Sequence, residues 1–355
     1  MIKPDPTNLT LIYTLEDARN SVTGASGFVG SHVVKALLER RYNVVAAARG
    51  SKADHIRKSC DKYPGRLRVA EITDLAKDDM SKDLEGVSGL VHVATPMIGR
   101  TPLDEMIPAT IECTMNVIRQ AERAGAKSIV ITGSGAQVTN TMDGTISNDG
   151  FNPITKEEAL ASGEPLMIYA AAKKYAELTV WEWAEAHPHV EVTILFPPWI
   201  FGPYAPEFYP LSPQNHSSNQ YLYGLINPEG RIAGNAPYVD VRDLAKAHVN
   251  ALESPPTSKV GRKRVVIASP QQIDGKKALE ILAEKRPQLK PRLIKRQLSE
   301  SSPEKYGCDF GRIEEVFGLK ETDFLPYEQV LRFGSLQSHL LVLKLLLLDC
   351  TGYDR

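Results

Sequence analysis

The sequence predicts an α/β protein with a doubly wound parallel sheet followed by a smaller C-terminal α/β domain. Two observations support this prediction. Short apolar segments rich in valine, isoleucine and alanine alternate with amphipathic segments of helical periodicity between residues 43 and 196. A turn with three glycines at a spacing of three residues, 24–30, precedes the first helical segment. Such alternation is typical of a parallel sheet covered by helices.

The composition of the 355 residues narrows the classes of function. The formal net charge is −1, from 42 Lys and Arg against 43 Asp and Glu, so we expect no general attraction to nucleic acid. The four cysteines, at 60, 113, 308 and 350, are far apart and indicate neither a zinc site nor a disulfide framework. We therefore expect a protein of the reduced cytoplasm with no metal ion and no nucleic-acid partner.

No segment has the pattern of a targeting or membrane-spanning sequence. Residues 1–6 lack the apolar core of a signal peptide. The longest apolar run, 340–348, contains Lys344 and is shorter than the ~20 residues that cross a bilayer. We expect no membrane partner.

The segment before the glycine turn is unusual for this fold. A phosphate-binding turn follows a buried strand, but charged and polar residues lie between the strand-like run 9–15 and the turn. Only Val22, with Ala18, remains to end an apolar strand. Two interpretations stay open: a short and poorly packed first strand, or an N-terminus that differs from the one with which the fold was built.

The glycine turn is suited to hold a diphosphate. Gly24 permits a tight turn, Gly27 lets the backbone approach phosphate oxygens, and Gly30 lets the next helix pack closely on the sheet. Free N–H groups of the first helical turn would face the anion. A glycine-rich surface turn is the alternative, because this motif is a weak signal alone. The helix that follows has one apolar face, formed by Val33, Val34, Leu37 and Leu38.

Patterning places the other elements in order along the chain. Strands are predicted at 43–48, 67–72, 89–96, 127–132, 191–196 and 264–268. Helices are predicted at 107–124, from 169 to beyond 181, at 244–252, at 271–282 and at 302–317. Residues 155–158 match a helix capping box, and the prolines in 197–203 should end regular structure. The segment 204–234, rich in Pro, Asn, Tyr and Gly, should form a lid or substrate loop.

Arg49 follows the second predicted strand, at the position that faces the adenosine ribose in dinucleotide-binding folds. A carboxylate there binds the 2′-hydroxyl, whereas an arginine accommodates a 2′-phosphate, so Arg49 favours NADP(H). Ser51 and Lys52 could assist, and Glu71 or Asp74 could reach the adenine. The alternative is a solvated surface arginine.

Ser134, Tyr169 and Lys173 together could reduce a carbonyl group. Ser134 follows the fifth strand, at the sheet edge where ligands bind in open α/β folds. Tyr169 and Lys173 are four residues apart and share one helix face, so the lysine should lower the tyrosine pKa from about 10. Tyr169 could then protonate the developing alkoxide, and Ser134 would orient the substrate oxygen. A surface Tyr and Lys with a turn serine is the alternative. His92, inside an apolar strand, is expected to be a core histidine.

Taken together, these motifs resemble the extended short-chain dehydrogenase/reductases of the NAD-dependent epimerase/dehydratase superfamily. The resemblance is strongest to the branch with dihydroflavonol reductase, cinnamoyl-CoA reductase, and yeast and fungal aldehyde and ketone reductases. It covers about residues 22–330. The residues that carry it are 23–30, Arg49, 91–96, Ser134, 169–173, 197–203 and 238–244. Thr110 and Cys113 depart from the family pattern, which has Asn and Gly there. The ending from 333 onward resembles no family ending, and a misassigned exon at either end would explain both termini.

The resemblance implies a Rossmann fold and a role for each motif. Tyr169 would be the proton donor, Lys173 its partner and a ligand of the nicotinamide ribose, and Ser134 the anchor of the substrate oxygen. The expected NADP(H)-binding residues are Gly24, Ser26, Gly27, Phe28, Val29, Gly30, Arg49, Lys52, Glu71, Ala94, Thr95, Pro96, Tyr169, Lys173, Pro197 and Ile200. The expected domains are an NADP-binding Rossmann domain of 18–198 with 237–268, a substrate-binding domain of 199–236 with 269–332, and atypical termini at 1–17 and 333–355.

The predicted function is the NADPH-dependent, reversible reduction of an aldehyde or ketone by hydride transfer, with secondary metabolism as a candidate setting. The protein would act on a small-molecule carbonyl or alcohol as a monomer or homodimer. One alternative is a nucleotide-sugar epimerase or dehydratase, or a 3β-hydroxysteroid-type dehydrogenase. Arg49 counts against the sugar enzymes. Another alternative is a non-catalytic NADP(H)-binding sensor or scaffold, against which the complete set of Ser134, Tyr169 and Lys173 counts.

Overall fold

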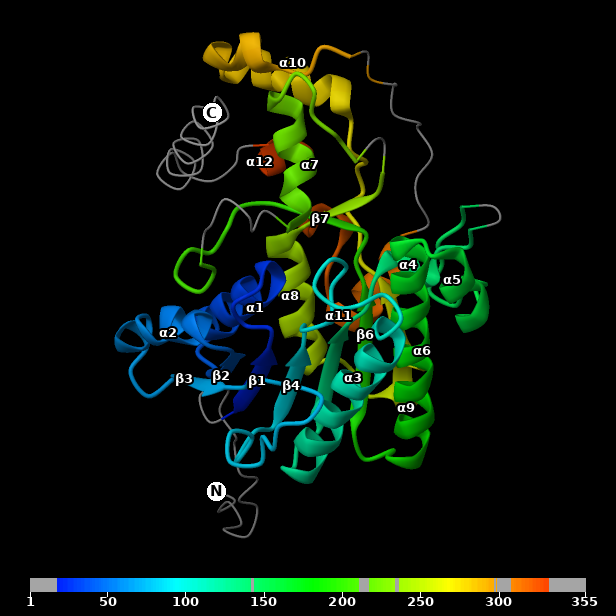
Figure 1. Cartoon of the computed structure of the whole chain (residues 1–355). Helices are drawn as coiled ribbons and strands as arrows, with labels where there is room; N and C mark the ends of the chain where they lie inside the picture. Colours follow the sequence, from blue (N-terminus) through cyan, green and yellow to red (C-terminus); the bar gives the residue numbers. More distant parts are fainter. Residues whose placement is uncertain are drawn as a thin grey trace, which may run out of the picture.

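The computed structural model describes residues 18–141, 144–210, 217–233, 236–296, 298 and 308–331 (Figure 1). Within these ranges a parallel seven-stranded sheet has the order β3-β2-β1-β4-β5-β6-β9. Its strands are β1 Arg19–Thr23, β2 Asn43–Ala48, β3 Leu67–Glu71, β4 Gly89–His92, β5 Ser128–Thr132, β6 Glu191–Phe196 and β9 Lys263–Val266. This order confirms the predicted doubly wound parallel sheet.

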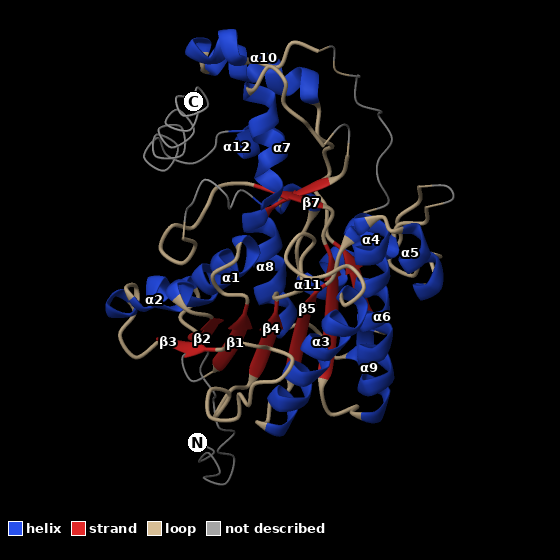
Figure 2. Cartoon of the chain, in the orientation of Figure 1, coloured by secondary structure: helices blue, strands red, loops and turns tan. Residues whose placement is uncertain are grey.

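Helices lie on both faces of the sheet (Figure 2). The α-helices are α1 Phe28–Glu39, α2 Ser51–Arg57, α3 Met106–Arg123, α4 Gly135–Val138, α5 Lys156–Ser162, α6 Pro165–Ala186, α7 Gln220–Tyr223, α8 Val241–Leu252, α9 Thr257–Val260, α10 Gly275–Lys285, α11 Phe310–Phe317 and α12 Tyr327–Leu331. Short 3₁₀ helices are η1 Cys60–Lys62, η2 Ser217–Asn219, η3 Gly224–Ile226, η4 Pro287–Arg292 and η5 Glu321–Asp323.

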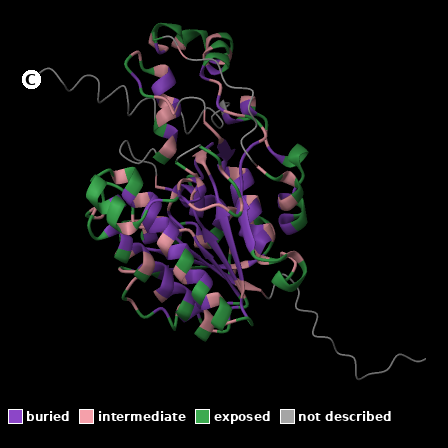
Figure 3. Cartoon of the chain, turned by 90° about the vertical axis from the view of Figure 1, so that its right-hand side faces the viewer, coloured by how far each residue is buried: buried purple, intermediate pink, exposed green. Residues whose placement is uncertain are grey.

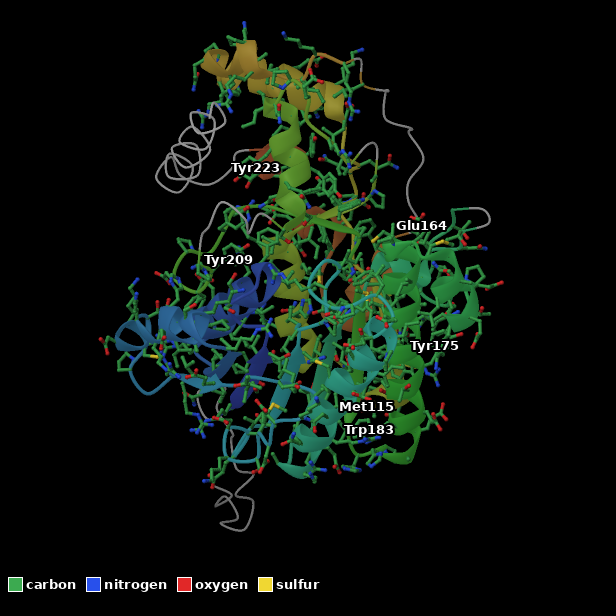
Figure 4. All side chains as sticks on the ribbon, viewed as in Figure 1. Met115, Glu164, Tyr175, Trp183, Tyr209 and Tyr223 are labelled. Carbon is green, nitrogen blue, oxygen red and sulfur yellow. The ribbon has the colours of Figure 1, made fainter. Side chains whose placement is uncertain are left out.

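Two apolar cores lie on the two faces of the large sheet. On one face α1, α8 and α11 pack against strand residues such as Val91. On the other face α3 and α6 pack against residues such as Leu90, the neighbour of Val91 that points the opposite way. Met115 of α3 and Trp183 of α6 belong to this second core, and Figure 4 labels both. Burial is greatest in the sheet and on the inward helix faces, as Figure 3 shows.

A third core forms a smaller unit beyond the carboxyl ends of the strands (Figure 1). A two-stranded parallel sheet pairs β7 Trp199–Phe201 with β8 Tyr238–Asp240. Phe201 and Tyr238 of this sheet share a core with α7, α10 and α12. The expectation that the prolines of 197–203 end regular structure was therefore wrong in part. Pro197 and Pro198 end β6, but β7 forms directly after them and contains no proline.

The first strand is the largest departure from expectation. β1 includes Arg19, Asn20 and Ser21, which sequence patterning assigned to an intervening polar segment, and it lies between β2 and β4. Ladder hydrogen bonds to β2 and β4 satisfy its backbone on both sides. Asn20 also accounts for the glycine at position 89 of β4, because a Cβ there would lie 2.3 Å from Asn20 Oδ1. The strand-like run 9–15 lies outside the described residues.

Most other predicted elements agree with the structure. β2 matches its prediction, and β3, β5, β6, α3 and the start of the capping box at Thr155 agree within one residue. β4 ends at His92, four residues earlier than predicted. α10 begins at Gly275 because Asp274 caps it, accepting from Lys277 N at 2.9 Å. Part of the predicted loop 204–234 is helical, as η2, α7 and η3.

Candidate active site

The glycine turn connects β1 to α1 and requires its glycines. Gly24 has a φ of +68°, and a Cβ there would lie 2.9 Å from Ala94 N. A Cβ at Gly30 would lie 2.1 Å from Gly24 O, so the helix could not approach the turn. The N-cap residue Gly27 provides no side-chain cap, which leaves N–H groups of the first turn of α1 free to bind an anion.

The loop after β4 lies against this turn, as expected for Ala94, Thr95 and Pro96. The Ala94 N–H donates to Thr23 Oγ1 at 3.4 Å. Thr95 Oγ1 is buried and has no hydrogen-bond partner among the described residues. A buried hydroxyl without a partner is costly unless a ligand satisfies it. The loop and the glycine turn therefore fit a dinucleotide that lies across them.

Cationic side chains gather where the adenosine end of such a cofactor would lie. Arg49 is exposed after β2, and Lys52 is half-buried in the first turn of α2. The pKa of Lys52 is lowered by burial and, secondly, by the nearby positive charges of Arg100 and Arg49. Sequence patterning missed Arg100, which lies in an irregular loop with no spacing signal. Glu71 instead pairs with Arg57 at 2.6 Å, so its predicted adenine contact stays a prediction.

Ser134 and Tyr169 meet at the carboxyl edge of the sheet. Ser134 follows β5 and is the N-cap of α4, where its Oγ accepts from Ala136 N at 3.2 Å. Its hydroxyl is hydrogen-bonded to Tyr169 of α6. The structure therefore brings these two predicted residues into contact.

Lys173 lies one helical turn after Tyr169 and is buried. Its Nζ donates to the Thr132 carbonyl at 2.8 Å, and burial lowers its pKa to about 8. Burial also raises the pKa of Tyr169, and the hydrogen bond from Ser134 opposes this shift. The expectation that Lys173 lowers the tyrosine pKa was wrong for this structure, because the ammonium is directed to Thr132 and burial of the phenol dominates.

His92 is confirmed as a core residue. It is 2% exposed, its Nδ1 is hydrogen-bonded to Thr23 Oγ1 at 2.8 Å, and burial lowers its pKa to about 3. A histidine that stays neutral at every physiological pH is a poor proton donor. The proton chemistry of the site therefore falls to the neighbouring side chains.

Of the two predicted carboxamide contacts, Pro197 lies beside the residue that follows Ser134. The Gly135 N–H donates to the Pro197 carbonyl at 2.8 Å. Ile200 is in β7, and its carbonyl accepts a hydrogen bond from Ser218 Oγ. The sheet edge and the smaller unit thus meet next to the candidate proton donor.

The segment 203–210 packs against the nucleotide-binding half of the molecule. His32 and His55 bind its backbone, with Nε2 2.8 Å from Pro203 O and from Pro206 O. The Tyr204 ring stacks on Tyr209 at 5.0 Å, and Figure 4 shows Tyr209 near α1. Sequence patterning placed residues 204–210 in the lid or substrate loop and Pro203 in the proline segment before it, and gave no sign of these contacts.

A buried polar network also lies behind Ser134. It contains Gln137, Glu177 and Arg264, none of which was predicted as a functional residue. Two signals were available, because Ser134 and Gln137 have capping-box spacing and Glu177 is four residues after Lys173. No spacing rule pointed to Arg264 of β9.

The described ranges contain neither a candidate membrane-spanning helix nor a candidate metal-binding cluster. No helix in them is both long and apolar enough to cross a bilayer. Nor do these ranges contain a group of three or more His, Cys, Asp or Glu side chains placed to hold a metal ion.

The fold and the glycine turn define a dinucleotide-binding α/β protein. The chain belongs to the NAD dependent epimerase/dehydratase family, whose family model matches residues 21–268. It is 31% identical over 263 residues to aldehyde reductase 2 of Sporidiobolus salmonicolor, covering 69% of this chain and 74% of the relative. It is 28% identical over 293 residues to an NADPH-dependent methylglyoxal reductase of Saccharomyces cerevisiae, covering 76% and 83%.

Solved structures share the fold. The crystal structure of Gre2 from Candida albicans in complex with NADPH superposes with a TM-score of 0.77 at 23% identity, covering 92% of this chain and 99% of that one. Vestitone reductase from alfalfa has a TM-score of 0.66 at 21% identity, covering 92% and 98%.

Proposed function

We propose that this protein reduces an aldehyde or ketone with NADPH. The observation that carries the proposal is the contact between Ser134 and Tyr169 beside the buried Lys173, at the carboxyl edge of a dinucleotide-binding sheet. The names of the two relatives, an aldehyde reductase and an NADPH-dependent methylglyoxal reductase, support the same activity. An NAD-dependent sugar epimerase would be expected to have an acidic residue at Arg49.

The residues present fit NADPH. The glycine turn and the first turn of α1 would hold the diphosphate, and Arg49, Lys52 and Arg100 would neutralise the 2′-phosphate. The Thr95 hydroxyl would gain a partner. Bound NADPH would supply the hydride that is added to the carbonyl carbon. Glu71 would contribute only if it left Arg57 for the adenine.

Tyr169 would donate its hydroxyl proton to the carbonyl oxygen as that oxygen gains negative charge. The phenol keeps its proton at neutral pH and can donate it. Burial raises its pKa and so makes it a weaker acid, an effect that the hydrogen bond with Ser134 opposes. Ser134 Oγ accepts from Ala136 N, which directs its own proton away from the helix and toward the substrate oxygen. Lys173 has three N–H groups and uses one on Thr132, so two remain for Tyr169 and the nicotinamide ribose.

The substrate would lie between the sheet edge and the smaller unit. The Trp199 ring meets Tyr221 edge to face at 4.8 Å, and both border the third core. We infer an apolar or aromatic carbonyl compound, with residues 199–236 and 269–332 as the substrate-binding part. A cytoplasmic location and a monomeric or homodimeric state are part of the same proposal. The scattered cysteines favour this location.

The test is loss of nicotinamide absorbance with NADPH and NADH across aromatic aldehydes, α-diketones and β-keto esters. Tyr169→Phe should lower kcat by roughly 10²- to 10⁴-fold, because it removes the acid. NADPH binding, measured by fluorescence titration, should be nearly unchanged. Wild-type turnover in the Tyr169→Phe variant would exclude this mechanism.

A further inference from the structure

A buried chain of polar groups runs from Ser134 to the outermost strand of the sheet. The Ser134 N–H donates to Gln137 Oε1 at 2.9 Å, and Gln137 Nε2 donates to Glu177 Oε2 at 2.6 Å. Glu177 Oε1 accepts from Trp181 Nε1 at 2.8 Å and from Arg264 Nε at 2.5 Å. The chain therefore joins α4, α6 and β9, which are distant in sequence.

These groups are shielded from water. The exposed fraction is 1% for Gln137, 3% for Glu177 and 5% for Arg264. Arg264 also donates to the Gly150 carbonyl at 3.1 Å, and its guanidinium lies 4.1 Å from the centre of the Phe151 ring. Attraction between charges is strong in such surroundings, and removal of one partner leaves an unpaired buried charge. The Glu177 carboxylate is therefore held in one place.

The carboxylate fixes the orientation of the Gln137 amide. A carboxylate only accepts hydrogen bonds, so Glu177 can face only the NH₂ group of that amide. The amide oxygen must then point to the Ser134 N–H. Without the carboxylate the amide could turn over, and its NH₂ group would oppose the Ser134 N–H, donor against donor. The position of Ser134 thus depends on the charge of Glu177, which acts on it through the Gln137 side chain.

We propose that Gln137, Glu177 and Arg264 are positioning residues that hold the Ser134 hydroxyl toward Tyr169. Each is at most 5% exposed, and they act through the backbone of Ser134, whose side chain caps α4. The inference rests on the proposed function, in which Ser134 orients the substrate oxygen.

Two substitutions of Gln137 separate positioning from simple packing. Gln137→Met keeps the side-chain length and removes both hydrogen bonds. We expect kcat to fall roughly 10- to 100-fold, because small displacements of an orienting group are costly. The dissociation constant of NADPH should stay unchanged, since the network does not reach the glycine turn or the cations.

Gln137→Glu makes the effect depend on pH. The introduced carboxyl can still accept from the Ser134 N–H, but it needs a proton to donate to Glu177. Burial and the adjacent carboxylate raise the pKa of the introduced group. The donor is present below that pKa and absent above it, so kcat relative to wild type should recover as pH falls and drop as pH rises. A purely structural defect would not produce this profile.

Gln120 of α3 offers a matched control. It is 5% exposed and so is buried like Gln137. It accepts from the Met80 N–H at 2.7 Å and donates to the Asp78 carbonyl at 2.9 Å. No described hydrogen bond joins Gln120 to Ser134. Gln120→Met should therefore lower the free energy of unfolding about as much as Gln137→Met does, and leave kcat unchanged.

The experiment measures kcat, KM and NADPH binding against pH for the four proteins. Amide hydrogen exchange of residues 133–140 is a second readout that needs no turnover, and Gln137→Met should accelerate it. Wild-type kcat in Gln137→Met, an equal loss in Gln120→Met, or a pH-independent loss in Gln137→Glu would overturn the inference. If the wild type reduces no carbonyl compound, the proposed function fails. In that case exchange at Ser134 alone decides whether Gln137 holds it.

Discussion

Replacing Lys173 by methionine should abolish reduction and stabilise the fold at neutral pH. Lys173 is 7% exposed, and burial lowers the pKa of its ammonium from 10.5 to about 8. Each pKa unit corresponds to ~1.4 kcal/mol, so burying this charge costs the folded state about 3 kcal/mol at pH 7. The bond to the Thr132 carbonyl offsets about 1 kcal/mol. We expect Lys173→Met to raise the free energy of unfolding by about 2 kcal/mol at pH 7.

The stability difference should depend on pH with a definite sign. The folded lysine releases its proton near pH 8 and the unfolded lysine near pH 10.5, so the unfolded chain binds more protons between these values. Wild-type stability therefore rises with pH in this window. From about pH 7 to about pH 9.5 the wild type should gain about 2 kcal/mol relative to Lys173→Met, which cancels the advantage of the variant.

Urea unfolding of both proteins at the two pH values measures this change, and NADPH absorbance measures reduction. Lys174→Met is the matched activity control, because Lys174 is also 7% exposed but donates to the Asn152 carbonyl at 2.9 Å. That variant should retain turnover. A difference in unfolding free energy that is the same at both pH values, or reduction by Lys173→Met at the wild-type rate, would refute the reasoning.

Three further substitutions test the cofactor site. Arg49→Asp should weaken NADPH binding roughly 10- to 100-fold and NADH binding much less, since it removes a cation from the 2′-phosphate position. Equal losses of the two affinities in fluorescence titrations would show that Arg49 does not contact that phosphate. Gly30→Ala should abolish NADPH binding and lower the free energy of unfolding by about 1–3 kcal/mol, because its Cβ would lie 2.1 Å from Gly24 O. Gly27→Ala, with 3.1 Å to the same oxygen, should be milder in both assays, and the reverse ranking would contradict this account.

Patterning predicted most of the sheet because the central residues of strands such as β2, β4 and β5 are buried and apolar. β2 is apolar after Asn43 and β6 is mostly apolar, and the bounds of both were predicted correctly. β1 could not be found in this way, since Arg19, Asn20 and Ser21 carry no apolar pattern. Its place depends on ladder partners from β2 and β4, which are tertiary contacts. Local patterning likewise missed β7, because a three-residue strand after two prolines resembles a loop.

The candidate site was predicted where its residues follow a spacing rule. The glycine turn has a fixed spacing, and Tyr169 and Lys173 are one helical turn apart, so both could be read from the chain. Arg100 and Arg264 follow no rule, because an irregular loop and a distant strand bring them into place. The direction of the Tyr169 pKa shift was also beyond sequence reasoning, since it depends on which acceptor the lysine finds and on how much water reaches the phenol.

One face of α6 carries both the candidate proton donor and the buried contacts that fix the helix against the sheet. Tyr169, Lys173, Glu177 and Trp181 recur every four residues of α6, and the first three contact residues of three other elements. Tyr169 meets Ser134, Lys173 meets the last residue of β5, and Glu177 meets Arg264 of β9. Buried bonds therefore set the distance between the proton donor and the sheet edge. The loops and helices of the smaller unit can vary with the substrate while this distance stays the same.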